Sequence, residues 1–416
     1  MRQIGVCIGC HVRKVRCVLL EGGPCLKCRT LNEPCVPYRS FGGSFEPRVP
    51  YSRVTEASVF REQVTPNELV TKRWLSMELV DITDWADDEV RTIQVSLDFV
   101  DAPFELKVRR FIPRPTDLLE EIWCDEQGRV RRWPVPPYAI MNMREAAKSM
   151  GTALEKNVAN YINALIDLRK GVEQTLLWGT YYHAFRHMSR AKTSEERALL
   201  ADAFRLWMFC RQSSHPDRLV GDEYLGMRQV DDPQSPFKDQ VTSPPVLGAQ
   251  LECIMYTCFL RPLRNQVLDR LVALIQEHHH RVWYTVYLVM FILLHSCSMI
   301  TNRDHVYATR VGLRSQFANT ESIYGLMHGA NILLVNFHAA MQGSMPFRLI
   351  QDGRLSEVVE KAELTAEQVD FIAWTVSLST ALREKWNEVR EKQDRCHDFY
   401  WVSQLYDGKW KRAEIR

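Results

Sequence analysis

The chain of 416 residues lacks the short motifs that mark common catalytic sites. It contains no glycine-rich phosphate loop, no nucleophile elbow and no zinc-protease motif. No heptad repeat of apolar residues is sustained over three heptads, so a parallel coiled coil is not predicted. The opening residues 1 to 5 include no apolar signal segment, and we therefore expect a reducing compartment. Since no residue pattern points to an enzymatic activity, we expect none.

One long stretch lacks charged side chains. Residues 282 to 300 form 19 positions without Lys, Arg, Asp or Glu, which is long enough to cross a bilayer. The stretch nevertheless contains Tyr284, Thr285, Tyr287 and His295, and it lies among other helical patterns. We therefore predict a helix buried in the middle of a domain, and no membrane partner.

Cysteine is concentrated near one end of the chain. Six of the twelve cysteines follow the spacing Cys-x2-Cys-x6-Cys twice, with seven residues between the two halves. These six are Cys7, Cys10, Cys17, Cys25, Cys28 and Cys35. In a reducing compartment this repeat predicts a metal site rather than a disulfide framework. The other six are scattered and are predicted to be buried free thiols: Cys124, Cys210, Cys253, Cys258, Cys297 and Cys396.

The number of sulfurs indicates a binuclear cluster. Each half of the repeat offers three thiolates, whereas a tetrahedral zinc ion takes four ligands. Two zinc ions can share six sulfurs when two of these bridge both metals, and the repeat suggests one bridge from each half. A single-zinc module with two spare cysteines is the alternative, but it leaves the duplicated spacing unexplained. So short a segment buries little apolar surface, and the metal would supply most of its folding free energy.

Positive charge is also concentrated in this segment. Residues 1 to 40 carry seven basic and two acidic side chains, whereas the whole chain has a net charge of only +2. The remaining residues are therefore net negative. Such a distribution suits a small module that binds the phosphate groups of a nucleic acid while the rest of the chain does not.

The segment resembles the DNA-binding domain of the fungal Zn(II)2Cys6 transcription factors. The likeness rests on Cys-Ile-Gly-Cys-His-Val-Arg-Lys-Val-Arg-Cys at 7 to 17, Gly-Gly-Pro-Cys-Leu-Lys-Cys at 22 to 28, and Cys35. It implies two zinc ions per chain, with Cys7 and Cys25 as the bridging ligands. It also implies a nuclear, RNA polymerase II type regulator that reads CGG-like triplets in double-stranded DNA.

The resemblance assigns the DNA contacts to the basic run between Cys10 and Cys17. Arg13 and Lys14 are expected to contact bases and phosphates, and Arg16 the DNA backbone. His11 and Val18 stand where the family usually has a basic residue and often has Asp. The alternative is therefore a zinc-cluster-bearing interaction protein or co-regulator with weak or non-specific DNA binding. Because no coiled coil is predicted, the sequence leaves two oligomeric states open: a monomer, or a dimer formed through the large domain.

The rest of the chain changes its pattern twice. Residues 41 to 75 are rich in Ser, Gly, Pro and charged side chains, as expected for a linker. Apolar residues then alternate with polar ones at 93 to 99 and 104 to 108, which predicts a β-hairpin. Two more strands are expected on either side of residues 125 to 128, before Pro134, Pro136 and Pro137 stop the sheet.

Helical periodicity follows, beginning with an apolar stripe from Met143 to Leu165. Thr193 with Glu196, and Thr365 with Gln368, have the spacing of capping boxes. Looser likenesses to the same fungal proteins occur at 89–94, 136–140, 248–250 and 400–406, and they imply a helical regulatory region that meets the transcription machinery or co-regulators. We expect a mainly α protein: a DNA-binding domain at 1–40, a linker at 41–75, a small β-rich segment at 76–135 and an α-helical regulatory domain at 136–416.

Overall fold

The alternating stretch after residue 84 forms an antiparallel hairpin in the computed structural model. The structure describes residues 10, 15–18, 25–30, 79, 81–97, 103–115, 117–166, 171–212, 217–276, 280–310 and 312–411. Strand β1 (Trp85–Ser96) pairs with β2 (Phe104–Phe111), with Ile93 opposite Leu106. Both of these side chains are buried, as period-two patterning requires of one face of a sheet. The hairpin prediction is confirmed.

Three short strands extend this hairpin into a five-stranded sheet. The strand order is β5-β2-β1-β6-β7, with β5 at Tyr138–Ile140, β6 at Arg218–Val220 and β7 at Val241–Thr242. The expectation that the prolines end the sheet is wrong, because β5 follows Pro137 directly and pairs with β2. Strands β6 and β7 come from within the region expected to be helical. They are too short to produce a periodic pattern, and they pair because tertiary folding brings β6 against β1.

A separate two-stranded sheet forms where it was expected. Strand β3 (Glu120–Cys124) pairs antiparallel with β4 (Val130–Pro134) around the turn at 125 to 128. Asp125 shapes this turn, because its carboxylate accepts hydrogen bonds from the backbone N–H groups of Gln127 at 3.0 Å and Arg129 at 2.8 Å. Aspartate stabilises turns in this way.

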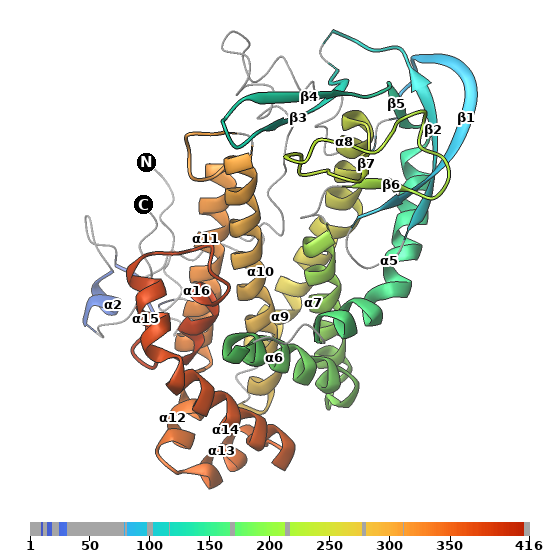
Figure 1. The fold of residues 1–416 in the computed structure, drawn as a ribbon. Coiled ribbons are helices and arrows are strands. Elements are labelled where there is room, and N and C mark those ends of the chain that lie inside the picture. Colours follow the sequence, from blue (N-terminus) through green and yellow to red (C-terminus); the bar gives the residue numbers. More distant parts are fainter. Residues whose placement is uncertain are drawn as a thin grey trace.

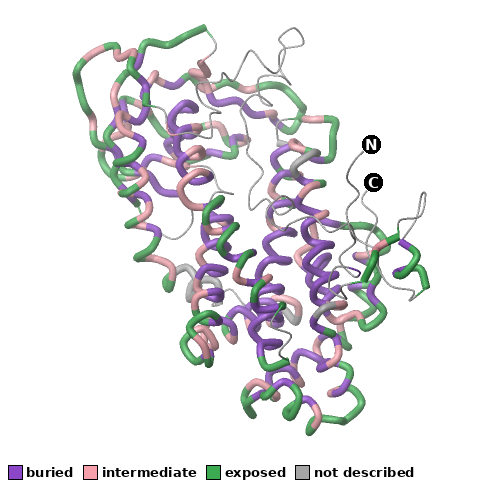
Figure 2. Tube along the Cα trace, turned by 180° about the vertical axis from the view of Figure 1, so that it is seen from behind, coloured by how far each residue is buried: buried purple, intermediate pink, exposed green. Residues whose placement is uncertain are grey.

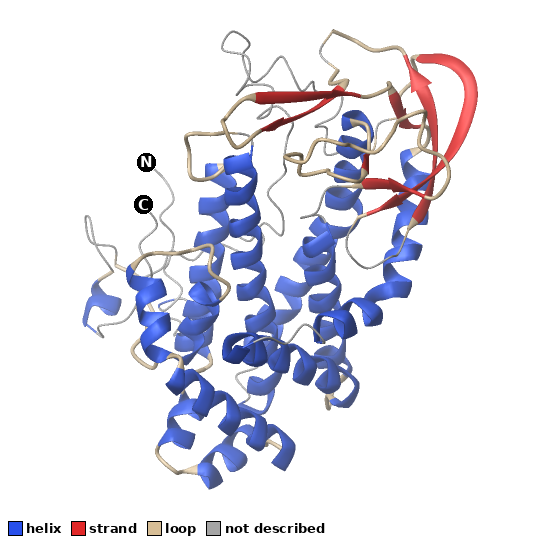
Figure 3. Ribbon diagram, viewed as in Figure 1, coloured by secondary structure: helices blue, strands red, loops and turns tan. Residues whose placement is uncertain are grey.

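Helices form the remainder of the body, and the strands gather at one end of it (Figures 1 and 3). The α-helices of the body are α5 (Met143–Ile166), α6 (Gly171–Arg190), α7 (Ser194–Gln212), α8 (Pro245–Ile254), α9 (Arg261–Gln276), α10 (Trp283–Arg310), α11 (Thr320–Val335), α12 (Met345–Gln351), α13 (Leu355–Ala362), α14 (Ala366–Ala381), α15 (Arg383–Glu391) and α16 (Phe399–Val402). Shorter helical segments are η2 (Met255–Leu260), η3 (His280–Val282), η4 (Asn336–Ala340) and η5 (Ser403–Tyr406), of which η2 and η4 are π-helical. The prediction of a mainly α fold is confirmed.

Helix α10 forms the centre of the hydrophobic core. It packs against α6, α7, α11 and α16, and buried positions run along the inner helices (Figure 2). Among the described helices, the segment His280–Thr309 is long and apolar enough to cross a membrane, yet 94% of its most apolar window is buried inside the protein. The predicted buried helix at 282 to 300 is confirmed. One apolar cluster extends from Ile93 in the sheet to Trp410 near the end of the chain, so sheet and helices share a core.

Two segments quoted for their family likeness meet at the sheet edge. Gln250 of α8 is fully buried, and its side-chain amide bonds the edge strand β5. Its Oε1 accepts from Ile140 N at 2.7 Å, and its Nε2 donates to Ile140 O at 3.3 Å. These two bonds satisfy backbone groups that would otherwise be left unpaired at a buried edge.

The two predicted capping boxes have different outcomes. At α14 both bonds are present: Gln368 N donates to Thr365 Oγ1, and Thr365 N donates to Gln368 Oε1 at 2.9 Å. At α7, Glu196 N donates to Thr193 Oγ1 at 3.2 Å, but the buried Glu196 carboxylate accepts from the hydroxyls of Thr193 and Thr285. The carboxylate therefore joins the start of α7, through the Thr193 hydroxyl, to Thr285 of α10. The expected linker at 41–75 lies outside the described residues.

Candidate metal centre and nucleic-acid interface

A short helix places two of the candidate ligands. Helix α2 (Leu26–Thr30) starts directly after Cys25, whose carbonyl accepts from Arg29 N at 2.9 Å. The Cys25 sulfur accepts from Cys28 N at 3.5 Å, in the place that a serine or aspartate oxygen takes at other helix starts. The Cys-x2-Cys spacing therefore gives Cys25 two roles, as cap and as candidate metal ligand. A thiolate suits this position because helix N-termini favour negative charge.

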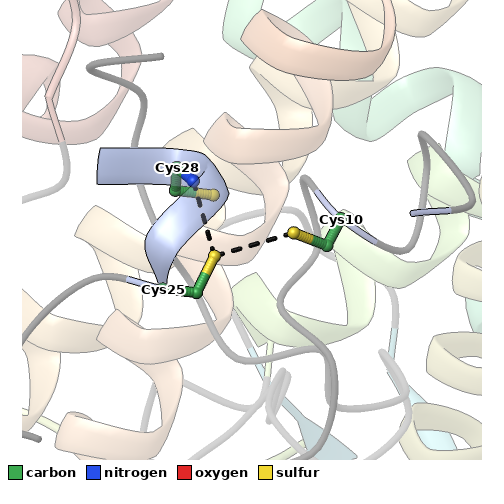
Figure 4. Close-up of side chains that lie close together, drawn as sticks. All are labelled: Cys10, Cys25 and Cys28. Carbon is green, nitrogen blue, oxygen red and sulfur yellow. Dashed lines mark hydrogen bonds between the residues drawn. The ribbon is translucent and has the colours of Figure 1, made fainter. Parts of the chain in front are cut away.

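Three sulfurs converge from two separate segments of the chain. Cys10, Cys25 and Cys28 are fully buried, and their Sγ atoms all lie within 4.8 Å of one another (Figure 4). The Cys10 and Cys25 sulfurs are 3.6 Å apart, far beyond the roughly 2.05 Å of a disulfide bond. Two sulfurs on one tetrahedral zinc, each about 2.3 Å from the metal, are about 3.8 Å apart. The observed separation fits a shared zinc ion.

The two halves of the repeat are joined at their backbones as well as at their sulfurs. Cys17, which is partly buried, packs against the three buried cysteines. One residue later, Val18 O accepts a hydrogen bond of 2.8 Å from Leu26 N, the first residue of α2. The third cysteine of the first half is thereby held close to the helix of the second half. Four of the six predicted ligands thus come together.

The described part of the basic run faces solvent. Arg16 is exposed, and so are its neighbours Val15 and Val18. Arg13, Lys14, Cys7 and Cys35 lie outside the described residues, as do His11 and Pro24. The structure therefore places one of the three predicted DNA-contacting side chains, on the surface of the cysteine cluster.

Helix α2 adds two cations that were not among the predicted contacts. Lys27 and Arg29 are exposed on either side of the buried Cys28. A signal was available in the sequence, because residues flanking a buried ligand on one helical turn must point away from it. Together with Arg16, these side chains are the exposed cations in the described part of the module. Exposed cations suit contact with phosphate groups.

The other six cysteines differ from the cluster in position and chemistry. None of these six described cysteines forms a disulfide. Two are buried as predicted, Cys210 and Cys297, and the other four are only partly buried. Burial raises the pKa of the Cys396 thiol to about 11 and also raises the pKa of Cys253, Cys258 and Cys297. These thiols therefore stay protonated near pH 7 and are poor metal ligands or nucleophiles.

Protein families match both the N-terminal cysteine segment and the rest of the chain. The family model described as "Fungal Zn(2)-Cys(6) binuclear cluster domain" matches residues 5–43, and the model described as "KpeA transcription factor" matches residues 60–405. The chain is 24% identical over 381 residues to the "Satratoxin biosynthesis SC3 cluster transcription factor SAT20" of Stachybotrys chartarum. That alignment covers 87% of this chain and 50% of the relative, so the chain spans about half the length of that protein. No solved structure matches the chain.

Proposed function

The chain belongs to the KpeA transcription factor family, and from this premise we propose that it is a zinc-dependent, sequence-specific regulator of RNA polymerase II transcription that acts in the nucleus. Its N-terminal segment matches a binuclear zinc cluster domain, and its remaining part matches a transcription factor family rather than an enzyme. The observation that carries the proposal is the convergence of three buried sulfurs within that N-terminal segment.

The proposed metal centre holds two zinc ions on six thiolates, with Cys7 and Cys25 bridging. Cys25 is supported as a bridge by its neighbours, since its sulfur lies 3.6 Å from the Cys10 sulfur and accepts a hydrogen bond from Cys28 N. It therefore adjoins one ligand from each half of the repeat. The zinc ions would hold the backbone of residues 1–40 in one conformation and take no part in chemistry.

The proposed DNA contacts start from the basic run. Arg13 and Lys14 would contact a CGG-like triplet and its phosphates in the major groove, and Arg16 the DNA backbone. Lys27 and Arg29, the exposed cations of α2, would add phosphate contacts. Residues 41–75 would act as linker, and the regions 76–135 and 136–416 as the regulatory part that meets the transcription machinery or co-regulators.

A selection of binding sites from random duplexes tests this function on the full zinc-loaded chain. We expect enrichment of a CGG-like triplet, because a side chain on a guanine edge discriminates by about 1 to 3 kcal/mol. In fluorescence anisotropy, Lys14→Ala should weaken binding to the selected duplex while native mass spectrometry still counts two zinc ions. Lys148→Ala on α5, an exposed lysine far from residues 1–40 in sequence, is the matched control. Normal duplex binding by Lys14→Ala would contradict the assigned contact.

A second function is favoured by one surface feature. Val18, where the family often has a charged residue, is 44% exposed beside the cysteine cluster, and Leu26 on α2 is 52% exposed. An apolar surface there suits a protein partner better than DNA, as expected of a cluster-bearing interaction protein or co-regulator. Salt-sensitive duplex binding without enrichment of any triplet would favour this second function.

A further inference from the structure

A chain of hydrogen bonds runs through the helical body and joins four helices. It begins at the buried Glu196 carboxylate of α7, which accepts a hydrogen bond from the Thr285 hydroxyl of α10. The Thr285 oxygen lies 2.9 Å from Nε2 of His187 on α6, and Nδ1 of that ring lies 3.5 Å from Nε2 of Gln368 on α14. We call these four residues, Glu196, Thr285, His187 and Gln368, the polar relay.

The direction of each bond in the polar relay is fixed by its two ends. Thr285 has a single hydroxyl proton and donates it to Glu196, so its oxygen must accept from His187 Nε2–H. At the other end, Gln368 Oε1 accepts from Thr365 N at 2.9 Å, which turns the amide NH2 group towards His187. The neutral ring therefore carries its proton on Nε2 and accepts a hydrogen bond at Nδ1.

A second proton on His187 is incompatible with this arrangement. The proton would lie on Nδ1 and face the NH2 group of Gln368, so that two donors would point at each other. The Gln368 side chain is also one half of the capping box of α14, because its Oε1 accepts from Thr365 N. Repulsion at Nδ1 would therefore act directly on the residue that caps the start of α14.

The surroundings of His187 keep its ring neutral near pH 7. Burial lowers the pKa of His187 below its usual value, although the negative charge of Glu196 opposes this shift. Tyr284 of α10 meets the ring edge-on, with ring centroids 4.8 Å apart. Burial raises the pKa of Tyr284, so this phenol stays uncharged. The relay is therefore complete at neutral pH and is exposed to protonation only in acid.

The charged residue of α14 beside Gln368 is already paired. Glu367 forms ion pairs with Arg186 at 2.8 Å and with Arg190 at 2.7 Å, and both arginines lie on α6. These exposed pairs join the same two helices from the outside, where solvent weakens them. They leave no unpaired carboxylate on the start of α14 to receive a charged His187 in place of Gln368.

From this geometry we infer that the polar relay is an acid-sensitive switch, in which a proton on His187 releases the first turn of α14 from α6. Further along α14, Trp374 lies so close to Gly179 of α6 that a Cβ at that position would be 2.6 Å from the ring. This contact contains no ionisable group, so the release is confined to the helix start. The switch belongs to the helical body and does not depend on the proposed DNA binding.

Hydrogen exchange followed by mass spectrometry tests the switch on the full zinc-loaded chain at pH 7 and pH 5, with rates corrected for the intrinsic effect of pH. Protection of residues 365 to 371 should fall about 10-fold more than protection at the centre of α10. Linkage to one histidine of ordinary pKa in the released state permits at most about 25-fold over this interval. Equal losses in the two segments would overturn the proposal.

His187→Gln supplies a side-chain amide that can donate to Thr285 and accept from Gln368 but cannot take up a proton. The excess loss of protection in acid should therefore disappear in this variant. His280→Gln, which removes an exposed histidine on η3, is the matched control and should keep the excess loss. The same excess loss in His187→Gln as in the wild-type chain would overturn the proposal.

The tautomer of His187 gives a second measurement, which does not require a folded variant. In NMR spectra of the full chain labelled with 15N at histidine, His187 should be the Nε2–H tautomer near pH 7. An Nδ1–H tautomer or a charged ring at that pH would overturn the switch. Triplet selection on the same samples reports on the proposed function alone: its failure leaves the switch standing, whereas normal selection without excess loss at α14 overturns only the switch.

Discussion

The cysteine module and the helical body offset the entropy lost on folding in different ways. In the described part of the module the buried side chains are Cys10, Cys25 and Cys28, while Val15, Val18 and Leu26 remain exposed. The body instead buries three apolar clusters, and the largest of them extends from the sheet to Trp410, with α10 at its centre. Ordering a chain costs about 1 to 2 kcal/mol per residue, and the body offsets this cost with apolar burial. The module has too little apolar surface, so coordination bonds must supply the equivalent stabilisation.

The module and the rest of the chain also differ in charge. The module presents Arg16, Lys27 and Arg29 to solvent around a core of sulfur. Outside residues 1 to 40 the chain is net negative, although cations do gather at a pocket beside α12 and α15. A chain built in this way can lose the structure of one part without losing the other. The experiments below test that independence.

Removing the metal should have the largest effect, and it should be confined to the module. Cys25→Ser takes away the proposed bridging ligand, and structural zinc contributes roughly 10 kcal/mol or more to folding in small modules. We expect native mass spectrometry to find fewer than two zinc ions and anisotropy to find no duplex binding. Cys258→Ser, which alters a thiol in the body, is the control and should keep both.

All eleven tryptophans lie beyond residue 70, so tryptophan fluorescence reports on the body alone. In Cys25→Ser, or after chelation, the urea midpoint followed by this fluorescence should be unchanged. A large shift of that midpoint would show that the two regions fold as one unit.

The converse change is Phe291→Ala in α10. Phe291 is fully buried and meets Tyr181 and Tyr287 edge-on, with ring centroids 6.2 and 6.4 Å away. Removing the ring leaves a cavity and should lower the free energy of unfolding of the body by about 3 to 5 kcal/mol. Urea titration measures this loss. Zinc content should stay at its wild-type value; its loss would mean that the module depends on the packing of the body.

Acid should weaken the body through His338. Burial lowers the pKa of His338 to about 4, although the ring donates a hydrogen bond from Nε2–H to Gln404 O and stacks on Trp410. The unfolded chain takes up this proton near pH 6.5, whereas the folded chain resists until about pH 4. The stabilisation is therefore complete above pH 6.5 and is lost as the pH falls towards 4.

Between pH 7 and pH 4.5 this group should account for about 2 to 3 kcal/mol of lost stability. His338→Gln should reduce the pH dependence by that amount, measured by urea titrations at the two pH values with tryptophan fluorescence. An unchanged slope in the variant would contradict the assignment to His338. Buried groups of other types remain in both proteins, so the difference isolates this one.

The smallest effect is expected at the capping box of α14. Thr365→Ala removes the oxygen that accepts from Gln368 N and should cost about 1 kcal/mol in the free energy of unfolding. Thr380→Ala on the same helix removes a hydroxyl that bonds back to Val376 O and should change stability by only a few tenths of a kcal/mol. Equal effects of the two changes would mean that the box does not stabilise the helix start.

Local patterns were informative wherever a long element has one buried face. Alternation between residues 93 and 108 predicted β1 and β2 with the correct face inward, and the stripe from Met143 predicted α5. The twofold cysteine spacing predicted a shared centre, and the sulfurs of Cys10, Cys25 and Cys28 do converge. The sequence pattern is clear in each case because it is repeated at several positions, each of which is set by whether the side chain lies in the interior or in solvent.

Interactions of single residues with partners far away in the sequence could not be predicted from local patterns. Gln250 is polar and fully buried, and its role is visible only when Ile140 lies beside it, 110 residues earlier in the chain. Glu196 has capping-box spacing, but its carboxylate also accepts a hydrogen bond from Thr285 of α10, 89 residues later in the chain. Strands β6 and β7 have three and two residues, too few to establish a period.

The order of residues along the chain was therefore enough to identify a metal-binding segment, a hairpin and a helical body, because local spacing sets which side chains share a face. It did not disclose how the sheet is completed, which polar groups are satisfied inside the core, or that Arg348, Arg383 and Lys409 line one pocket. Those outcomes depend on contacts between residues far apart in the chain, and such contacts exist only after the apolar core has packed.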